Sequence, residues 1–243
     1  MKGFSGGLLV GASITALFAL GFALQPGQPL ADLGKPTPTA FVLRSTESCL
    51  GAVAVFSLDY QNCDFSGMTF TEADLRYANL RGASLEGAVL TSTMLNNCDF
   101  SFANLQRANL QFAVLYNANF GSANLRNAIL QGIHGSGGAY YDGLDFSGAD
   151  LSGADLSGAY APRITFRNAT LVSANLSGAS LWSANFANAD LSRALLRNAS
   201  LGSANLVGAN LTGADLTGAD LEDVSLTDAI LTGATMPDGT LHE

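Results

Sequence analysis

Charged residues, histidines and cysteines are scarce in this sequence, and each scarcity removes a class of function. Only 13% of the residues are charged and the net charge is −9, so the chain lacks the basic stripe that nucleic-acid-binding proteins need. Three cysteines are too few for a disulfide framework. His134 and His242 lie far apart, without a nucleophile motif or a cluster with metal-ligand spacing. We therefore expect no catalytic residues, no metal and no cofactor.

The sequence does contain a repeat of five residues. In Leu201–Asp220 (LGSANLVGANLTGADLTGAD), Leu recurs at every fifth position, Ala precedes the next Leu by two residues, and Asn or Asp lies between. We call the Leu or Phe position central. Central positions recur from Phe65 to Leu130 and again from Phe146 to Met236, with a weak Ala161. A period of five fits neither a helix, at about 3.6, nor a strand, at about 2, so the repeats must stack as a solenoid to bury their apolar residues.

The repeat resembles the A(D/N)LXX motif of the pentapeptide-repeat family, which Ala214–Gly218 (ADLTG) matches at each defined position. The resemblance covers most of the sequence. It implies an all-β fold, a right-handed quadrilateral β-helix with four repeats in each coil. Central side chains and the Ala two positions earlier should lie inside. Neighbouring coils should lie about 4.8 Å apart, as paired strands do.

The N-terminal segment has the order of an export signal. Lys2 precedes an apolar run that ends before Gln25–Pro29, a breaker-rich exit. A cleaved signal peptide and a retained membrane anchor both remain open, and we expect membrane contact only through this segment if it is uncleaved. Either way the repeats are exported, to the thylakoid lumen or the periplasm. The ending Met236–Thr240 resembles cyanobacterial members, which favours the lumen. The predicted segments are a signal or anchor (1–31), a linker and N-terminal cap (32–60), the β-helix (61–238) and a tail (239–243).

Cys49 and Cys63 flank the segment that should cover the open end of the first coil. Family members from cyanobacteria resemble this region in placing two cysteines just before the first repeat. A Cys49–Cys63 disulfide would suit an oxidising compartment. The other interpretation is that Cys63 and Cys98 are small buried residues, because both stand two positions before a central residue. The sequence leaves both open.

Gln131–Gly143 (QGIHGSGGAYYDG) interrupts the repeat. Leu130 and Phe146 are 16 positions apart, which is three repeats and one residue. This small shift favours a one-residue bulge in a continuous β-helix over a segment that loops out. The Gly-rich part has neither the dinucleotide nor the phosphate-loop spacing, so we infer no cofactor.

Two kinds of function remain. Some pentapeptide-repeat proteins imitate DNA through acidic columns and inhibit topoisomerases, and a DNA-mimic inhibitor is our alternative interpretation. Here the column from Asp150 through Thr170 to Asp190 is broken. We favour an exported, non-catalytic rod that binds a protein and no nucleic acid. Pro162 should lie beside Trp182 on the outer surface, and the acidic end should steer a basic partner or block end-to-end stacking. The candidate interaction surface consists of Phe112, Tyr116, Tyr160, Pro162, Trp182, Asp220, Glu222 and Asp223.

Overall fold

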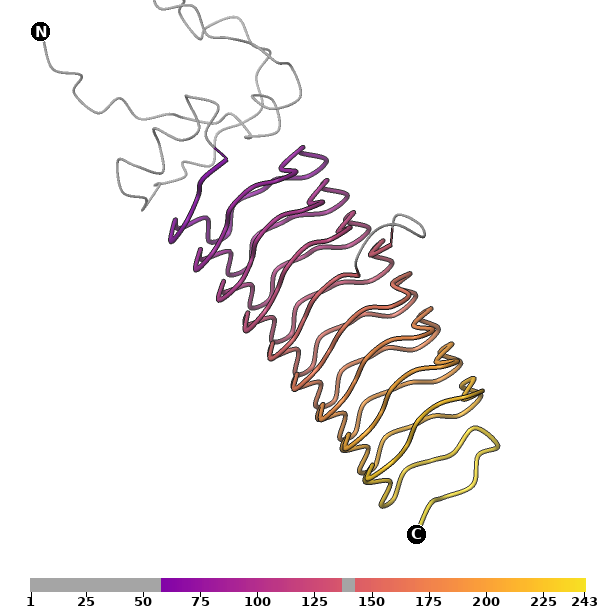
Figure 1. The fold of residues 1–243 in the computed structure, drawn as a ribbon. Helices are drawn as coiled ribbons and strands as arrows, with labels where there is room; N and C mark the ends of the chain where they lie inside the picture. Colours follow the sequence, from indigo (N-terminus) through magenta and orange to yellow (C-terminus); the bar gives the residue numbers. More distant parts are fainter. Residues whose placement is uncertain (1–57, 137–142) are drawn as a thin grey trace, which may run out of the picture.

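The computed structural model describes residues 58–136 and 143–243, which form a rod of stacked coils (Figure 1). The chain advances along the rod from Leu58 at one end to the C-terminus at the other. Residues 1–57 and 137–142, and with them the predicted export segment and Cys49, lie outside the described residues. No helix able to span a membrane occurs in the described part of the chain.

Four repeats form each coil, as the family resemblance implies. The residue before each central residue makes a parallel bridge to the residue 20 positions later, as in Asp59 with Asn79 and Asn185 with Asn205. On either side of one such bridge, the N–H of Phe65 donates to the C=O of Ser84 (2.7 Å) and the N–H of Ser84 donates to the C=O of Cys63 (2.8 Å). Each side of a coil therefore contributes one bridging residue, instead of a longer strand, to a ladder along the rod.

We name the four sides of the coil A to D in chain order. The central residues of side A are 60, 80, 100, 120, 146, 166, 186, 206 and 226, and those of side B are 65, 85, 105, 125, 151, 171, 191, 211 and 231. Those of side C are 70, 90, 110, 130, 156, 176, 196, 216 and 236, and those of side D are 75, 95, 115, 135, 161, 181, 201 and 221. A corner takes the letters of the two sides that it joins.

The core is filled by the two positions that the sequence predicts. Central residues from Tyr60 to Leu216 are at most 5% exposed. The Ala positions between them are buried as well. Side A carries a ladder of phenylalanine rings, Phe100, Phe120, Phe146, Phe166 and Phe186, with neighbouring ring centroids 4.6, 4.7, 5.5 and 4.9 Å apart. These separations agree with the predicted coil spacing of about 4.8 Å.

Each corner is a tight turn with a left-handed residue. The N–H of Met68 donates to the C=O of Phe65 (3.0 Å), and Gly67 between them has a φ of 68°. The bridging Asp or Asn supports the turn, as when Asp64 Oδ1 accepts the N–H of Ser66 (3.0 Å). This explains why Asp and Asn recur before the central residue. Many of the left-handed positions hold residues other than Gly or Asn, and three hold aromatic residues.

We expect Tyr77→Asn to stabilise the rod. Tyr77 has a φ of 67° and its side chain is 66% exposed. Its left-handed backbone is therefore strained, and burial of the ring does not compensate for that strain. Asn tolerates this conformation better, and the gain should approach about 1 kcal/mol. Urea unfolding of both proteins measures it. The control is Ser203→Asn at the same corner, where φ is 58° and no aromatic ring is removed. A lower unfolding midpoint for Tyr77→Asn would contradict the strain argument.

The interruption adds six residues to one coil. Bridges across it join residues 26 positions apart, Asn119 with Asp145 through His134 with Tyr160, whereas all other parallel bridges span 20. The expected one-residue bulge is therefore wrong. Adding five residues to a five-residue repeat leaves its phase unchanged. An insertion of six residues therefore shifts the phase in the same way as an insertion of one residue does. Residues 131–136 continue the coil on sides C and D.

The core exchanges large and small residues where the coil is lengthened. Gly135 and Ala161 occupy central positions of side D that hold Leu in most coils. Leu144, two positions before Phe146, replaces the usual Ala and fills the vacated volume. A Cβ added to Gly135 would lie 2.9 Å from Leu144 Cδ2 and 3.0 Å from Ala161 Cβ. Gly135 is thus required by the approach of Leu144, and the core stays continuous past the added residues.

The two ends of the described rod differ. At the first, the N–H of Asn79 donates to the C=O of Leu58 (2.7 Å), so pairing begins three residues before the predicted start of the β-helix. Tyr60, Phe65 and Phe70 form edge-to-face pairs there, with centroids 5.7 and 5.6 Å apart. At the other end, the tail turns back and Leu241 makes an antiparallel bridge to Thr235.

Candidate interaction surface

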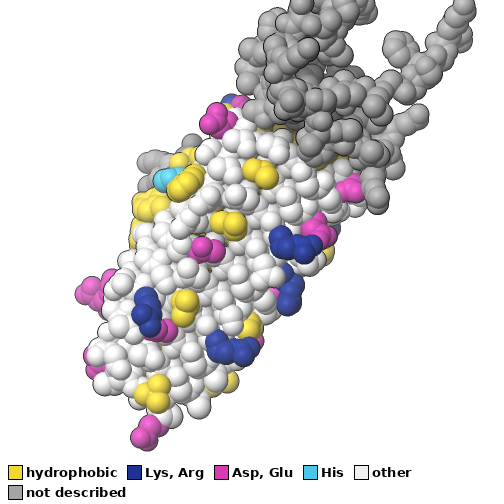
Figure 2. Space-filling view, turned by 180° about the vertical axis from the view of Figure 1, so that it is seen from behind, with side chains coloured by type: hydrophobic (Ala, Val, Ile, Leu, Met, Phe, Trp, Pro, Cys, Tyr) yellow, Lys and Arg dark blue, Asp and Glu magenta, His cyan; other side chains and the backbone are white. Residues whose placement is uncertain are grey.

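The most apolar part of the surface lies on side D and its two corners. The bridging residues of this side include Met94, Val114, His134 and Tyr160, which pair in that order along the rod. On the other sides this position is mostly Asp, Asn, Ser or Thr. Figure 2 shows hydrophobic side chains gathered beside a histidine at one edge of a surface that is otherwise mainly white. We define the side D patch as Met94, Phe112, Val114, Tyr160 and Trp182.

Three aromatic residues give this patch its accessible area. Phe112, Tyr160 and Trp182 are 52%, 46% and 39% exposed. Phe112 lies at corner C/D and its ring leans along the rod, since a Cβ on Gly132 of the next coil would come within 2.7 Å of Phe112 Cδ1. Tyr160 is on side D and Trp182 at corner D/A. Their alignment depends on the 26-residue offset, which places His134 between Val114 and Tyr160.

The register predicted around Trp182 is confirmed. The N–H of Ala161 donates to the C=O of Ser180, and the N–H of Arg163 donates to the C=O of Trp182, both at 3.0 Å. Pro162, between the two donors, therefore lies in the coil next to Trp182. The guanidinium carbon of Arg163 stands 5.3 Å from the indole centroid, a cation–π distance.

Pro162 itself is buried, so the expectation that it belongs to the outer surface is wrong. Ser101 and Ala187 are buried at the same position after a central residue, whereas most residues at that position, such as Ser152 and Ser177, are partly exposed. A docked partner would reach Trp182 and Arg163 but not the proline ring.

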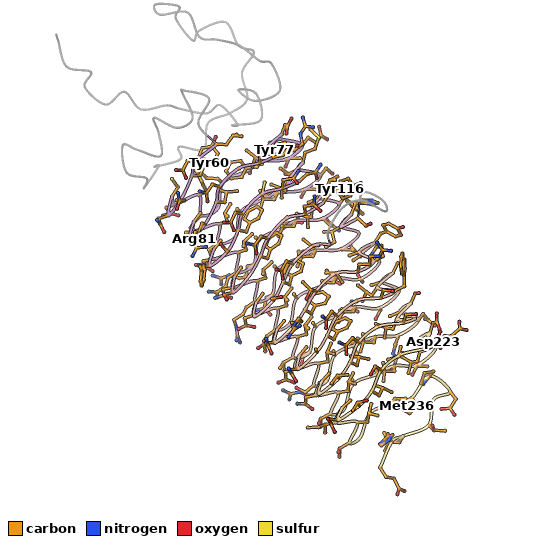
Figure 3. The ribbon with its side chains drawn as sticks, viewed as in Figure 1. Tyr60, Tyr77, Arg81, Tyr116, Asp223 and Met236 are labelled. Atoms are coloured by element: carbon orange, nitrogen blue, oxygen red, sulfur yellow. The ribbon has the colours of Figure 1, made fainter. Side chains whose placement is uncertain are left out.

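The remaining aromatic residues are placed separately. Tyr116 is half-buried at corner D/A, on the same edge of the rod as Tyr77 (Figure 3). Phe102 lies at corner A/B, where its ring centroid is 4.5 Å from the guanidinium carbon of Arg81. Arg81 is on the opposite edge from Tyr77 and Tyr116 (Figure 3), so Phe102 does not join the side D patch.

The acidic residues singled out in the sequence gather in the last coil. Asp220 ends the bridging column of side D, and Glu222 and Asp223 follow at corner D/A; all three are exposed. The Oδ1 of Asp220 accepts the N–H of Glu222 (3.0 Å). Glu222 is two coils beyond Trp182 at the same corner. The structure therefore places the aromatic and acidic candidates on side D or its two corners but in different coils.

Acidic columns that would imitate DNA are broken, as the sequence predicts. Bridges join Asp150 to Thr170 and Thr170 to Asp190. Arginines pair with several carboxylates, including Arg126 with Asp150 (3.0 Å) and Arg197 with Asp215 (2.6 Å). The Thr217 hydroxyl, together with Arg197, holds the pKa of Asp215 below its usual range. These pairs interrupt any continuous negative field along the sides.

The cysteines offer no reactive thiol among the described residues. Burial raises the pKa of the Cys98 thiol to about 12, and its Sγ donates to the C=O of Leu75 (2.9 Å). Cys63 is buried and disulfide-bonded. Its expected partner, Cys49, lies outside the described residues. Across 58–136 and 143–243, no group of His, Cys, Asp or Glu has a metal-binding arrangement.

Comparison with known proteins identifies the family. The family model of pentapeptide repeats matches eight times, together over residues 61–132 and 138–241. The chain belongs to the pentapeptide-repeat family, whose members commonly act as protein-interaction modules. The predicted all-β, right-handed quadrilateral β-helix is thereby confirmed.

Solved structures of the same family resemble this chain. HetL of the cyanobacterium Nostoc sp. strain PCC 7120, a protein involved in heterocyst differentiation regulation, is 31% identical over 76% of this chain and 91% of HetL, with a TM-score of 0.41. QnrB1, a plasmid-mediated fluoroquinolone resistance protein, is 21% identical over 73% of this chain and 77% of its own, with a TM-score of 0.40. A thylakoid-lumen member from Arabidopsis thaliana is 26% identical over 51% of this chain and 68% of its own, with a TM-score of 0.20. No curated protein matches the sequence.

Proposed function

We propose that this protein is an exported, non-catalytic rod that binds a protein partner through the side D patch. The observation that carries the proposal is the concentration of apolar and aromatic residues on one side over consecutive coils. Met94, Val114 and Tyr160 replace polar residues at the bridging position of side D, and Phe112 and Trp182 flank them. Exposed aromatic residues surrounded by polar surface are the usual anchors of protein interfaces.

The rod is suited to this task because its surface is fixed. Neighbouring coils are held together by backbone hydrogen bonds of 2.6–3.1 Å and by buried columns of core residues. A partner would therefore meet aromatic groups at set spacings along the rod, with little conformational entropy lost on binding. The sequence of residues 1–31 has the order of an export signal, which supports a place in the thylakoid lumen or the periplasm as part of this proposal.

The proposal is tested by crosslinking in the compartment that fractionation assigns to the protein. A photo-reactive amino acid replaces Tyr160 in one full-chain variant and Phe102 in the other, and crosslinked products are identified by mass spectrometry. We expect position 160 to give one dominant protein adduct. Position 102 should not crosslink to that protein. Adding Trp182→Ala to the first variant should reduce that adduct by about tenfold, because removing an interface aromatic anchor commonly costs more than 1 kcal/mol.

Phe102 is a matched control because it is an exposed aromatic residue on a different corner of the same rod. Equal adducts from both positions, or an adduct from position 160 that survives Trp182→Ala unchanged, would show that the side D patch is not the binding surface.

A further inference from the structure

The last coil has a backbone edge that the described residues leave open on sides D and A and partly open on side B. In the coil before it, the N–H of Leu206 donates to the C=O of Ser225 (2.8 Å) and the N–H of Gly208 to the C=O of Thr227 (2.9 Å). The equivalent groups of the last coil on side A are the N–H of Leu226 and of Asp228, and neither has an acceptor among the described residues. The C=O of Val224 likewise has no donor there. Side D repeats this pattern. On side B, the N–H of Leu231 and the C=O of Ala229 have no partner there, whereas the N–H of Gly233 is bonded to the tail.

The fourth side shows how such an edge is satisfied. On side C, the N–H of His242 donates to the C=O of Ala234, and at corner B/C the N–H of Gly233 donates to the C=O of His242, both at 2.8 Å. The tail thus adds an antiparallel strand, with Leu241 opposite Thr235. An extended segment can therefore take the place of the next coil on this edge.

The apolar residues behind the open edge are incompletely covered. Val224 and Leu226 on side A are only partly buried, whereas Ala204 and Leu206, their counterparts one coil earlier, are each 1% exposed. An added strand with apolar side chains facing the core would cover both residues. The backbone and the apolar groups therefore require the same kind of occupant.

The charge around side A defines the occupant further. Glu222 and Asp223 at corner D/A and Asp228 at corner A/B are exposed, and none of them forms a salt bridge within the described residues. The sequence contains no Lys or Arg after Arg197. The same end of a second copy would bring like charges together, whereas a Lys- or Arg-bearing segment would meet opposite charges on both flanks.

We propose that side A of the last coil, residues 222–228, binds an extended peptide segment of a partner in which apolar residues alternate with Lys or Arg. The segment pairs with the N–H groups of Leu226 and Asp228 and the C=O of Val224. Its apolar side chains cover Val224 and Leu226, and its basic side chains reach the three carboxylates. This is strand addition to a sheet edge, and it is independent of the side D patch.

Binding of a fluorescein-labelled Lys-Val-Lys-Val-Lys-Val-Lys peptide to the full chain, followed by anisotropy, tests the proposal. The variant Glu222→Gln/Asp223→Asn/Asp228→Asn should bind about tenfold more weakly, since each exposed charge pair contributes up to about 1 kcal/mol. Positions 223 and 228 have φ of 55° and 58°, which Asn adopts readily, so the variant should fold. The control Glu72→Gln/Asp145→Asn/Asp155→Asn removes the same number of charges elsewhere and should bind normally.

Hydrogen exchange separates strand addition from simple charge attraction. The amides of Leu226 and Asp228 should become protected when the peptide binds, while that of Leu206, already bonded, should not change. A peptide N-methylated at alternate residues keeps its charge and should not bind. Trp182→Ala should leave this binding intact, so failure here and failure of the side D proposal are distinguishable.

Three outcomes would overturn the proposal. The first is equal affinity of the wild type and the acidic variant. The second is equal affinity for the N-methylated peptide. The third is a dimer in sedimentation that protects Leu226 and Asp228 without peptide, because a second copy would then be the occupant of the edge.

Discussion

Leu176→Asp is expected to prevent the β-helix from forming. Leu176 is the central residue of side C in the middle of the rod, is 0% exposed, and stacks between Leu156 and Leu196. A carboxylate at this position would have no partner in a column of apolar side chains. An uncompensated buried charge costs about 3–5 kcal/mol, a large share of the stability of a typical domain. Circular dichroism and urea unfolding should show loss of the structure or a much lower midpoint.

The matched control is Leu195→Asp, one coil further along on the same side. Leu195 is an exposed bridging residue between Asn175 and Asp215. Asp is common at this position, where it accepts the N–H of the residue after the centre, here Arg197. The guanidinium of Arg197 already holds Asp215 (2.6 Å) and would lie between the two carboxylates. We expect a change within about 0.5 kcal/mol. Equal losses for both variants would mean that the inside and outside positions are misassigned.

The repeat sequence was sufficient to predict a stacked coil because each repeat places the same residue types at the same positions. A large central residue, a small residue two positions earlier and an Asp or Asn between them predict coils that stack, and the resemblance to the pentapeptide-repeat family implies that each coil has four sides. The confirmed bridges at 20 positions and the phenylalanine ladder follow from this pattern and this resemblance. The lengthened coil did not follow from either. Neither Gly135 nor Leu144 obeys the repeat, and their packing against each other is a tertiary contact that periodicity does not encode.

The same limit explains what the sequence missed on the surface. Met94, Val114 and His134 are visible departures from Asp or Asn at the bridging position, but their column could be joined to Tyr160 only with the 26-residue offset. Phe112 and Trp182 were predicted to face outward because they follow central residues, whereas the column of bridging residues was not predicted. The prediction that Pro162 lies on the outer surface was wrong for a different reason. Whether neighbouring coils cover a small residue depends on side-chain geometry, which a repeat pattern leaves undefined.

The two proposed surfaces differ in the physical basis of binding. The side D patch offers apolar area on a saturated backbone, so its partner would dock by side-chain contacts and lose little affinity in salt. Side A of the last coil offers unpaired backbone groups beside carboxylates, so its partner would be extended and its affinity would fall as ionic strength rises. Titrations at low and high salt therefore distinguish which surface a captured partner uses.

Phe146→Ala is expected to have the second large effect on stability. Phe146 is the first central residue after the interruption, and its ring stacks on Phe120 at 4.7 Å and on Phe166 at 5.5 Å. Truncation removes buried apolar area and leaves a cavity that neighbouring coils, tied by backbone hydrogen bonds, cannot close. Phe→Ala changes in cores cost about 3–5 kcal/mol. Urea unfolding followed by circular dichroism measures the loss. Phe146→Leu should cost much less, because Leu80 and Leu206 occupy equivalent positions of side A.

A double-mutant cycle tests whether the ladder is continuous past the added residues. Phe120 and Phe146 are 26 positions apart in sequence but adjacent in the stack. The changes Phe120→Leu and Phe146→Leu should therefore be non-additive, with a coupling of about 0.5–1.5 kcal/mol, as for other aromatic pairs. The pair Phe100→Leu and Phe166→Leu serves as the control, because two rings of the ladder separate these residues and their effects should add. Additive effects at Phe120 and Phe146 would mean that the coils on either side of the interruption do not stack, and that the lengthened coil divides the rod into two independent cores.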